Sequence, residues 1–127
     1  MIDRSEALLY HEELVRRFGG SQGVRDEGIL DAALHRPFAT FGGVDLFPTP
    51  ESKAAAIMHG IITGHPFIDG NKRTGYALAR LILQVHGLDI EATEDERYDL
   101  VIQVATGQLD ADGVRAWLEP RVKQVRA

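Results

Sequence analysis

Cysteine is absent from the 127-residue chain, which excludes disulfide bonds and thiolate zinc sites and is compatible with a reducing cytoplasm. Long apolar runs are absent too. The most apolar stretches are interrupted by His59, Arg80 or Gln84, and none approaches the roughly 20 residues of a membrane span. The first six residues lack the basic head and apolar core of a signal peptide. We therefore expect a cytoplasmic protein with no membrane partner.

Positive charge is in deficit as well. Fourteen Lys and Arg residues against 19 Asp and Glu residues give a net charge of −5, so we expect no direct nucleic-acid binding. The chain also has no phosphate-binding Gly-x-x-x-x-Gly-Lys-Ser/Thr loop, no Gly-x-Ser-x-Gly elbow and no His-Glu-x-x-His helix. His11 precedes two glutamates but has no second histidine at helical spacing, so we place it at the edge of the core and reject a metal site there.

The composition that remains is that of an ordinary globular protein, with 44% hydrophobic and 26% charged residues. A chain of this length buries roughly two-thirds of its unfolded surface on folding. The sequence shows no repeats, low-complexity tracts or linkers. We expect a single domain over residues 1–127.

Apolar residues recur at helical spacing in six segments, each bounded by capping or helix-breaking residues. The expected helices run from about Ser5 to Phe18, Glu27 to Arg36, Pro50 to Gly64, Asn71 to His86, Glu94 to Thr106 and Asp112 to Pro120. Their expected N-caps include Ser5, Asp26, Thr49, Thr93 and Asp112. The spacing predicts that Phe18, Val85 and Tyr98 are buried and that His59 is exposed.

Residues 38–48 lose the helical period, and five apolar residues there surround Gly42-Gly43. This pattern indicates a small hairpin, or flap, between the second and third helices. It either covers the core or offers an edge to which a partner peptide adds as a strand. The third and fourth helices should pack against each other at the centre, because both are apolar and a six-residue loop joins them. The fold class is all-α, a compact bundle of about six helices with one flap.

Nine consecutive residues between the third and fourth helices concentrate the chemistry of the chain. They read His-Pro-Phe-Ile-Asp-Gly-Asn-Lys-Arg and form the central loop, residues 65–73. A helix start presents unpaired N–H groups and a positive dipole end, which favour phosphate. The loop adds a proton acceptor, a carboxylate, a tight turn, an amide and two cations. Together these groups predict transfer of a phosphate group from a nucleotide.

Each residue type suits one part of that reaction. Histidine titrates near neutrality, so His65 can serve as the general base for a hydroxyl. Asp69 can hold magnesium, which takes one or two carboxylates and completes its shell with phosphate and water oxygens. Gly70 lets the backbone pass close to a phosphate, and Lys72 and Arg73 supply cations to it. The remaining loop residues suit phosphate orientation or helix capping by Asn71 and burial of Phe67 as an anchor.

Residues 65–73 match the loop of the Fic/Doc family, His-Pro-Phe-x-Asp/Glu-Gly-Asn-Gly/Lys-Arg, at every defined position. The sequence therefore resembles that family, and it does so over nearly its whole length. The segments 17–20, 26–28 and 105–107 are similar to the Doc (death-on-curing) branch. Fic-type adenylyltransferases carry Gly after the Asn of the loop and a second Arg three residues beyond the first. Here those positions hold Lys72 and Tyr76.

The resemblance implies the Fic/Doc fold and a toxin of a type II toxin–antitoxin pair. Such a toxin is a kinase that uses ATP and Mg²⁺ to phosphorylate a threonine of translation elongation factor Tu, which halts translation. The roles that it implies are His65 as catalytic base, Asp69 on magnesium, and Gly70, Asn71, Lys72 and Arg73 on phosphates, with His65, Asp69 and Arg73 catalytic. The implied partner is an antitoxin whose C-terminal segment covers the groove. The flap would hold the backbone of the target beside His65.

Two alternatives stay open at this point. Pro66 and Gly70 follow the Fic pattern more closely than the founding Doc toxin does, so the chain could instead transfer a nucleotidyl group by Fic-type AMPylation of a protein hydroxyl. The other alternative is a catalytically inactive binding module that keeps only the fold. Every reactive position of the loop is filled here, which favours an enzyme.

Overall fold

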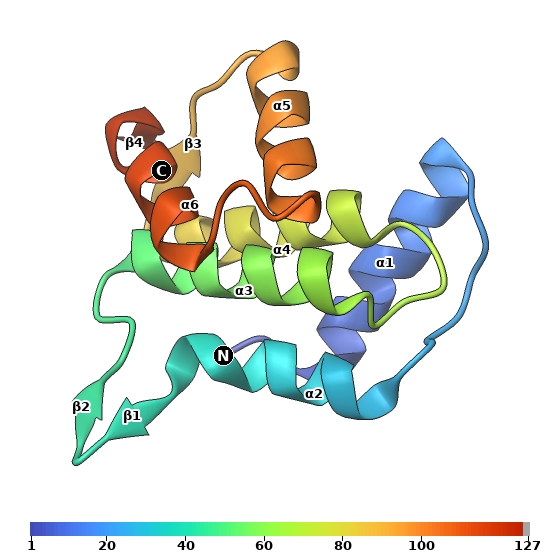
Figure 1. The fold of residues 1–127 in the computed structure, drawn as a ribbon, viewed down its shortest axis with the longest axis horizontal. Helices are drawn as coiled ribbons and strands as arrows, with labels where there is room; N and C mark the ends of the chain where they lie inside the picture. The colour runs from blue at the N-terminus through green and yellow to red at the C-terminus, as the bar shows by residue number, and fades with distance from the viewer. Residues whose placement is uncertain (126–127) are drawn as a thin grey trace.

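The computed structural model describes residues 1–125, and within them it has six α-helices and two small two-stranded sheets (Figure 1). The helices are α1 (Arg4–Phe18), α2 (Glu27–His35), α3 (Pro50–Gly64), α4 (Asn71–Val85), α5 (Glu94–Ala105) and α6 (Ala111–Leu118). The 3-10 turns are η1 (Arg36–Phe38) and η2 (Glu119–Arg121). The strands are β1 (Thr40–Phe41), β2 (Val44–Asp45), β3 (Leu88–Ile90) and β4 (Val122–Gln124). The predicted all-α bundle is confirmed.

The α3–α4 pair forms the centre of the molecule, as its apolar sequence predicts. Helix α3 also packs against α2, α5 and α6 (Figure 1). Its side chains are buried almost all round, which suits a helix surrounded by other helices. The fully buried residues of the core come from all six helices and the central loop, and include Leu30, Ile57, Ile61, Leu78 and Val104.

Within residues 1–125, five of the six helices begin where a short polar side chain caps them. Asp26, Thr49 and Thr93 accept hydrogen bonds from backbone N–H groups of the first turns, which confirms them as N-caps. The predictions at the two terminal helices are wrong. Asp3 rather than Ser5 caps α1, because Glu6 three residues later completes a capping box with it. Asp110, and not the predicted Asp112, caps α6. Its Oδ1 accepts a hydrogen bond from the Gly113 N–H at 2.8 Å.

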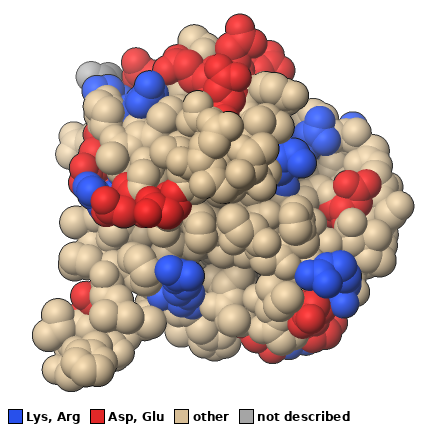
Figure 2. All heavy atoms as spheres, viewed as in Figure 1, with Lys and Arg blue, Asp and Glu red and all other residues tan. Residues whose placement is uncertain are grey.

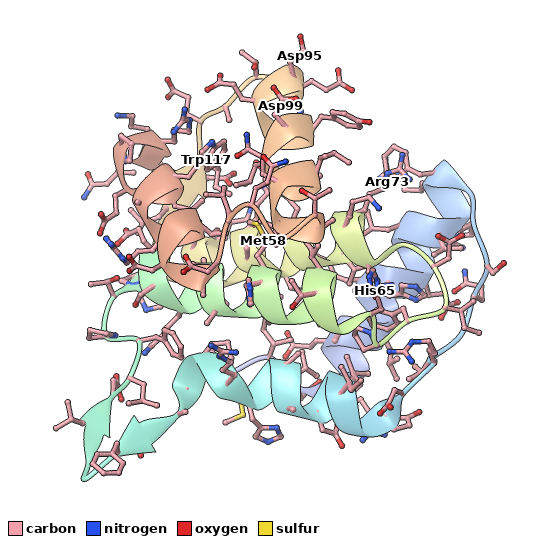
Figure 3. All side chains as sticks on the ribbon, viewed as in Figure 1. Met58, His65, Arg73, Asp95, Asp99 and Trp117 are labelled. Atoms are coloured by element: carbon pink, nitrogen blue, oxygen red, sulfur yellow. The ribbon has the colours of Figure 1, made fainter. Side chains whose placement is uncertain are left out.

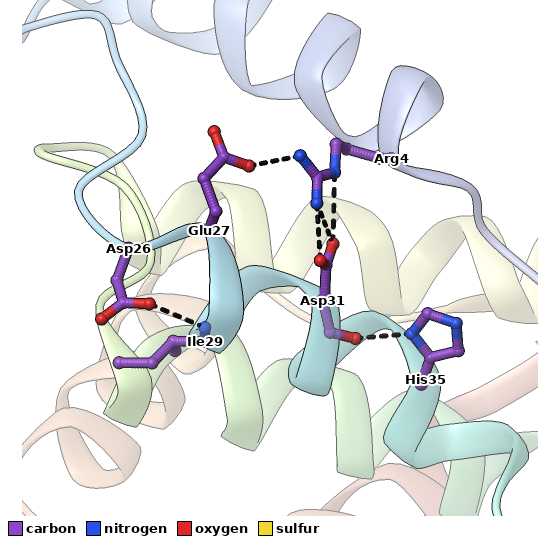
Figure 4. Close-up of polar contacts among 6 residues, drawn as sticks. All are labelled: Arg4, Asp26, Glu27, Ile29, Asp31 and His35. Atoms are coloured by element: carbon purple, nitrogen blue, oxygen red, sulfur yellow. Dashed lines mark hydrogen bonds and ion pairs between the residues drawn. The ribbon is translucent and has the colours of Figure 1, made fainter.

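An ion-pair cluster joins α1 to α2 (Figure 4). The Arg4 guanidinium donates to both carboxylate oxygens of Asp31 and to Glu27. In α2 itself, the Asp26 carboxylate accepts from the Ile29 N–H at 3.0 Å. These contacts hold the start of α1 beside α2, so that the far end of α1 reaches the loop after α3.

The flap predicted between the second and third helices is the β1–β2 hairpin, in which Thr40 pairs with Asp45 and Phe41 with Val44. Gly42 and Gly43 turn with φ of 58° and 79°, the positive values that a two-residue hairpin turn requires. Phe41 and Val44 are 80% and 68% exposed. The hairpin tip therefore does not cover the core, whereas Phe38 at the start of the flap packs against it.

Four burial predictions are also wrong. Phe18, Val85 and Tyr98 are exposed, because they lie at helix ends or on a cleft rather than under another element. His59 is half-buried rather than exposed. The sequence also gave no sign of the β3–β4 pair, whose strands have three residues each. Within residues 1–125, no helix combines the length and hydropathy needed to cross a membrane.

Candidate active site

The central loop starts at the residue that ends α3. His65 is the C-cap of α3 and has left-handed backbone angles, φ 51° and ψ 54°. It is the one residue other than glycine with positive φ within residues 1–125, a conformation that surrounding contacts must maintain. Arg25 supplies two of them, donating from Nε to the His65 carbonyl at 2.7 Å and from Nη2 to the Gly64 carbonyl at 2.9 Å. The imidazole itself stays exposed.

Phe67 anchors the middle of the loop, as the sequence predicts. Its ring is fully buried and stacks on His11, with ring centres 3.8 Å apart and planes 6° from parallel. The Asn71 amide closes the loop by accepting from the Phe67 N–H at 3.1 Å and donating to the Phe67 carbonyl at 3.0 Å. The loop also forms an antiparallel bridge from Phe67 to Val24. Its backbone is thus held on two sides.

Asp69 presents its carboxylate at the surface of the loop. Oδ1 accepts from the Gly70 N–H at 2.9 Å, and Oδ2 accepts from the Ser21 N–H at 3.2 Å. The Asp69 carbonyl accepts from His11 Nε2 at 2.7 Å. A Cβ on Gly20 would lie 2.7 Å from Asp69 Oδ2, so a larger residue there would displace this carboxylate. Both carboxylate oxygens keep free lone pairs, which a cation could use.

Helix α4 begins with an open N-terminus. Its N-cap is Gly70, which has no side chain, so the N–H groups of Asn71, Lys72 and Arg73 have no side-chain cap. Such a helix start is suited to binding an anion. The capping role considered for Asn71 is wrong, because its amide bonds to Phe67 instead. Asn71 Nδ2 also lies 3.5 Å from His65 Nδ1, so Asn71 supports the loop and the imidazole together.

A cleft of about 830 Å³ extends from this helix start. The central loop and α4 line it on one side, the end of α1 on another, and α5 on a third. Figure 3 shows His65 and Arg73 at this end of the molecule, near the end of α1. The cleft brings together all six predicted site residues, namely His65, Asp69, Gly70, Asn71, Lys72 and Arg73. Residues 38–48 do not line it, and the flap precedes the opposite end of α3, a 15-residue helix about 22 Å long. The expectation that the flap lies beside His65 is therefore wrong.

The cleft concentrates positive charge in an acidic protein. Its basic residues are Arg17, Lys72, Arg73, Arg80 and Arg97, against two acidic ones, Asp69 and Glu94. Of the five basic residues, only Arg80 takes part in an ion pair within residues 1–125. The Arg73 guanidinium lies over the Phe18 ring, 4.6 Å from its centre. Figure 2 shows acidic side chains gathered over α5 at the top of the view. Basic side chains lie below them, on the side of α1.

Sequence reasoning missed three supporting residues. His11 looked like a residue at the edge of the core, yet it holds the Asp69 carbonyl and the Phe67 ring. Arg25 fell in a stretch with no helical period, and it holds the His65 backbone. Arg97 lay on a helix with no visible link to the loop, and it lines the cleft. No local pattern marks these residues, because each acts across more than 20 positions of chain.

The model of the Fic/DOC family matches residues 1–83, which include α1, the central loop and most of α4. The chain belongs to the Fic/DOC family. It is 44% identical over 103 residues to a protein named Toxin Doc from Mycolicibacterium smegmatis, covering 80% of this chain and 79% of that one. It is 29% identical over 113 residues to Protein kinase doc of Escherichia phage P1, covering 89% and 88%. A Fido domain-containing protein of Dictyostelium discoideum is 42% identical over 52 residues, covering 38% and 36%.

These similarities place the chain in the Doc branch of the Fic/DOC family. The match extends over most of the chain in both Doc relatives, so it does not depend on the nine-residue loop alone. The family match covers the α1 and α4 sides of the cleft, and α5 lies beyond it.

Proposed function

We propose that this Fic/DOC protein is a toxin that transfers the γ-phosphate of ATP to a serine or threonine hydroxyl of a protein. The observation that carries the proposal is the cleft at the start of α4. An uncapped helix N-terminus, an exposed histidine and four cations that form no ion pair with any described residue come together there. A nucleoside triphosphate has the concentrated negative charge that such a site neutralises. The relative named Protein kinase doc supports phosphoryl transfer in particular.

The residues divide the reaction among them. His65 takes the proton of the acceptor hydroxyl, and the hydroxyl oxygen forms a bond to the γ-phosphorus. The bond between that phosphorus and the oxygen that bridges it to the β-phosphate breaks, and ADP leaves with the electron pair. The N–H groups at the start of α4, with Lys72 and Arg73, bind the phosphate oxygens and stabilise the charge that develops on them. A positioned general base contributes roughly a hundred- to ten-thousandfold in rate.

The Asp69 carboxylate fits a magnesium ion that is shared with a nucleotide. Within residues 1–125, no group of three or more carboxylate or imidazole side chains could hold a metal by itself. One carboxylate with free lone pairs beside a phosphate site is the arrangement that magnesium uses when phosphates and water complete its shell. Bound there, the ion would neutralise phosphate charge.

Partners follow from the same proposal. The protein named Toxin Doc supports a toxin whose activity an antitoxin restrains. We propose that the antitoxin covers the cleft with its C-terminal segment, and that the acceptor protein is translation elongation factor Tu. A cleft rich in unpaired cations would favour acidic groups on any segment that binds in it.

The test is a transfer assay with purified chain, elongation factor Tu, Mg²⁺ and ATP labelled at either the γ- or the α-phosphate. We expect label only from the γ-position, and none with His65→Ala. Asp69→Ala should also abolish transfer. Label from the α-position would make the protein a nucleotidyltransferase and overturn the kinase assignment. Full transfer by His65→Ala with a normal melting temperature would overturn the site.

A further inference from the structure

Arg97 brings to the cleft a cation that does not belong to the central loop. It projects from α5 and lines the cleft, with its guanidinium carbon 5.9 Å from the centre of the Tyr76 ring. Arg97 takes part in no ion pair within residues 1–125. This matters because its own helix is acidic: Glu94, Asp95 and Glu96 precede it directly. Figure 3 shows Asp95 and Asp99 at the outer end of α5, away from His65.

Arg80 shows what a structural arginine looks like in the same cleft. Its guanidinium donates to Asp89 twice, from Nε at 3.0 Å and from Nη2 at 2.8 Å. These bonds hold the pKa of Asp89 down at about 2. The charge of Arg80 is thus compensated within the protein, and its Nε and Nη2 groups already donate to a carboxylate. Within the described residues 1–125, Arg97 has no carboxylate partner, so its charge remains available to a ligand.

Tyr76 explains why a cation from α5 is useful at this point. It lies on α4 three residues after Arg73 and four after Lys72, so it follows them one turn further along the same face. A phenol carries no positive charge in either protonation state, so Tyr76 adds no cation to this part of the cleft. The ring instead supports the guanidinium of Arg97.

We propose that Arg97 is a phosphate-binding residue of the cleft that contacts a phosphate of the nucleotide other than the one held at the start of α4. The inference rests on the proposed use of a nucleoside triphosphate. One helical turn is about 5.4 Å, so a chain of phosphates that starts at the helix N-terminus extends beyond the reach of the terminal N–H groups. A cation one turn further along then neutralises the rest of its charge. In this protein the cation comes from α5 and not from α4, the helix that follows the central loop.

The test measures binding rather than turnover, by isothermal titration calorimetry with Mg·ATP and with adenosine, in the absence of any protein acceptor. Arg97→Gln removes the charge, and Arg97→Lys keeps it without the planar fork. Arg16→Gln is the matched control, since it removes one positive charge from an exposed α1 residue that pairs with Glu13 and does not line the cleft. Melting temperatures of all variants confirm folding.

We expect Arg97→Gln to weaken ATP binding about tenfold or more, the size of one charge-assisted hydrogen bond. Adenosine affinity should stay within twofold, Arg97→Lys should be intermediate, and Arg16→Gln should match the wild type. ATP binding by Arg97→Gln within twofold of wild type would overturn the inference. So would equal losses in Arg97→Gln and Arg16→Gln, or an adenosine loss as large as the ATP loss.

His65→Ala separates this inference from the proposed function. It should bind ATP like the wild type and transfer no phosphate. Normal ATP binding by Arg97→Gln, together with loss of transfer in His65→Ala, would refute the role of Arg97 and leave the kinase proposal standing. Weakened binding by Arg97→Gln in a chain that transfers no γ-phosphate would support Arg97 and refute the kinase. A wild-type chain that binds no ATP would refute both.

Discussion

The Asn71 and His65 side chains lie side by side in the central loop but have different roles. The Asn71 amide is 8% exposed and bonds to both backbone groups of Phe67. The His65 imidazole is exposed and makes one long contact, 3.5 Å from Asn71 Nδ2. Replacing Asn71 leaves two backbone groups without partners, whereas replacing His65 does not. Stability and chemistry can therefore be separated at adjacent side chains.

We expect Asn71→Ala to lower the free energy of unfolding by about 2–4 kcal/mol, since two buried hydrogen bonds are lost, and to reduce phosphate transfer. His65→Ala should abolish transfer and change the free energy of unfolding by less than about 1 kcal/mol. Chemical denaturation followed by circular dichroism measures both. Equal stabilities of the two variants would contradict the loop-closing role of Asn71.

His11 is a positioning residue in this arrangement, because it contacts the loop rather than a substrate. It is 3% exposed, and it combines a stacking contact with a hydrogen bond. We expect His11→Phe to keep the stacking and lose only the bond from Nε2 to the Asp69 carbonyl.

That substitution should cost about 1–2 kcal/mol of stability and lower kcat for transfer, because the loop around Asp69 loosens, while the KM for the acceptor protein changes little. His11→Ala should cost more, since it also removes the ring beneath Phe67. Steady-state kinetics and melting curves of the pair give the answer. Identical effects of the two substitutions would show that the ring stacked on Phe67 contributes nothing beyond the hydrogen bond.

At the scale of elements, the β1–β2 hairpin is joined to the bundle but takes no part in its core or its cleft. Its tip is exposed, and its position at the start of α3 keeps it at the other end of that helix from His65 (Figure 1). Helix α5 has the opposite character: its outer surface is acidic, while one of its faces lines the cleft.

We expect the double substitution Phe41→Ser and Val44→Ser to change the free energy of unfolding by less than about 0.5 kcal/mol, because surface residues with few contacts contribute little. Its affinity for ATP should equal that of the wild type. Differential scanning fluorimetry and calorimetric titration check the two statements. A marked loss of ATP affinity would place the hairpin at the cleft, against the geometry described above.

At the scale of the whole molecule, the central helix α3 carries a titratable group that opposes folding at low pH. His59 Nδ1 is buried and has no hydrogen-bond partner within residues 1–125. Burial lowers the pKa of His59 below its ordinary value of 6.5, with a further contribution from Arg36. The unfolded chain therefore binds a proton more readily than the folded one. The stability that neutral His59 contributes is present above pH 6.5 and is lost as the pH falls through the lower folded value.

We expect the melting temperature to fall as the pH drops below about 6.5, and to fall less in His59→Gln, which cannot titrate. His35→Gln, at an exposed position of α2, is the control and should follow the wild-type curve. Melting curves at half-unit pH steps make the comparison. If His59→Gln lost stability with pH as steeply as the wild type, another group would be responsible.

Much of the molecule follows from local sequence. Helix positions come from apolar spacing together with polar caps, and both are local properties. The central loop could be recognised because nine consecutive residues carry its chemistry. Local signals failed at Phe18 and Tyr98, where the apolar side of a helix faces a cleft rather than another helix. They also failed at β3 and β4, which are too short to show a strand period.

By itself, the sequence determined the six helices, the loop between α3 and α4, and the identity of the six candidate site residues, because each depends on neighbours along the chain. Tertiary structure decided what surrounds that loop. His11 and Arg25 lie 40 or more residues upstream of the loop, and Arg97 lies some 25 residues downstream of it. Only the packing of α1, the α1–α2 connection and α5 around α4 brings them there. Which cations remain unpaired likewise depends on the positions of distant carboxylates, and no local pattern records those.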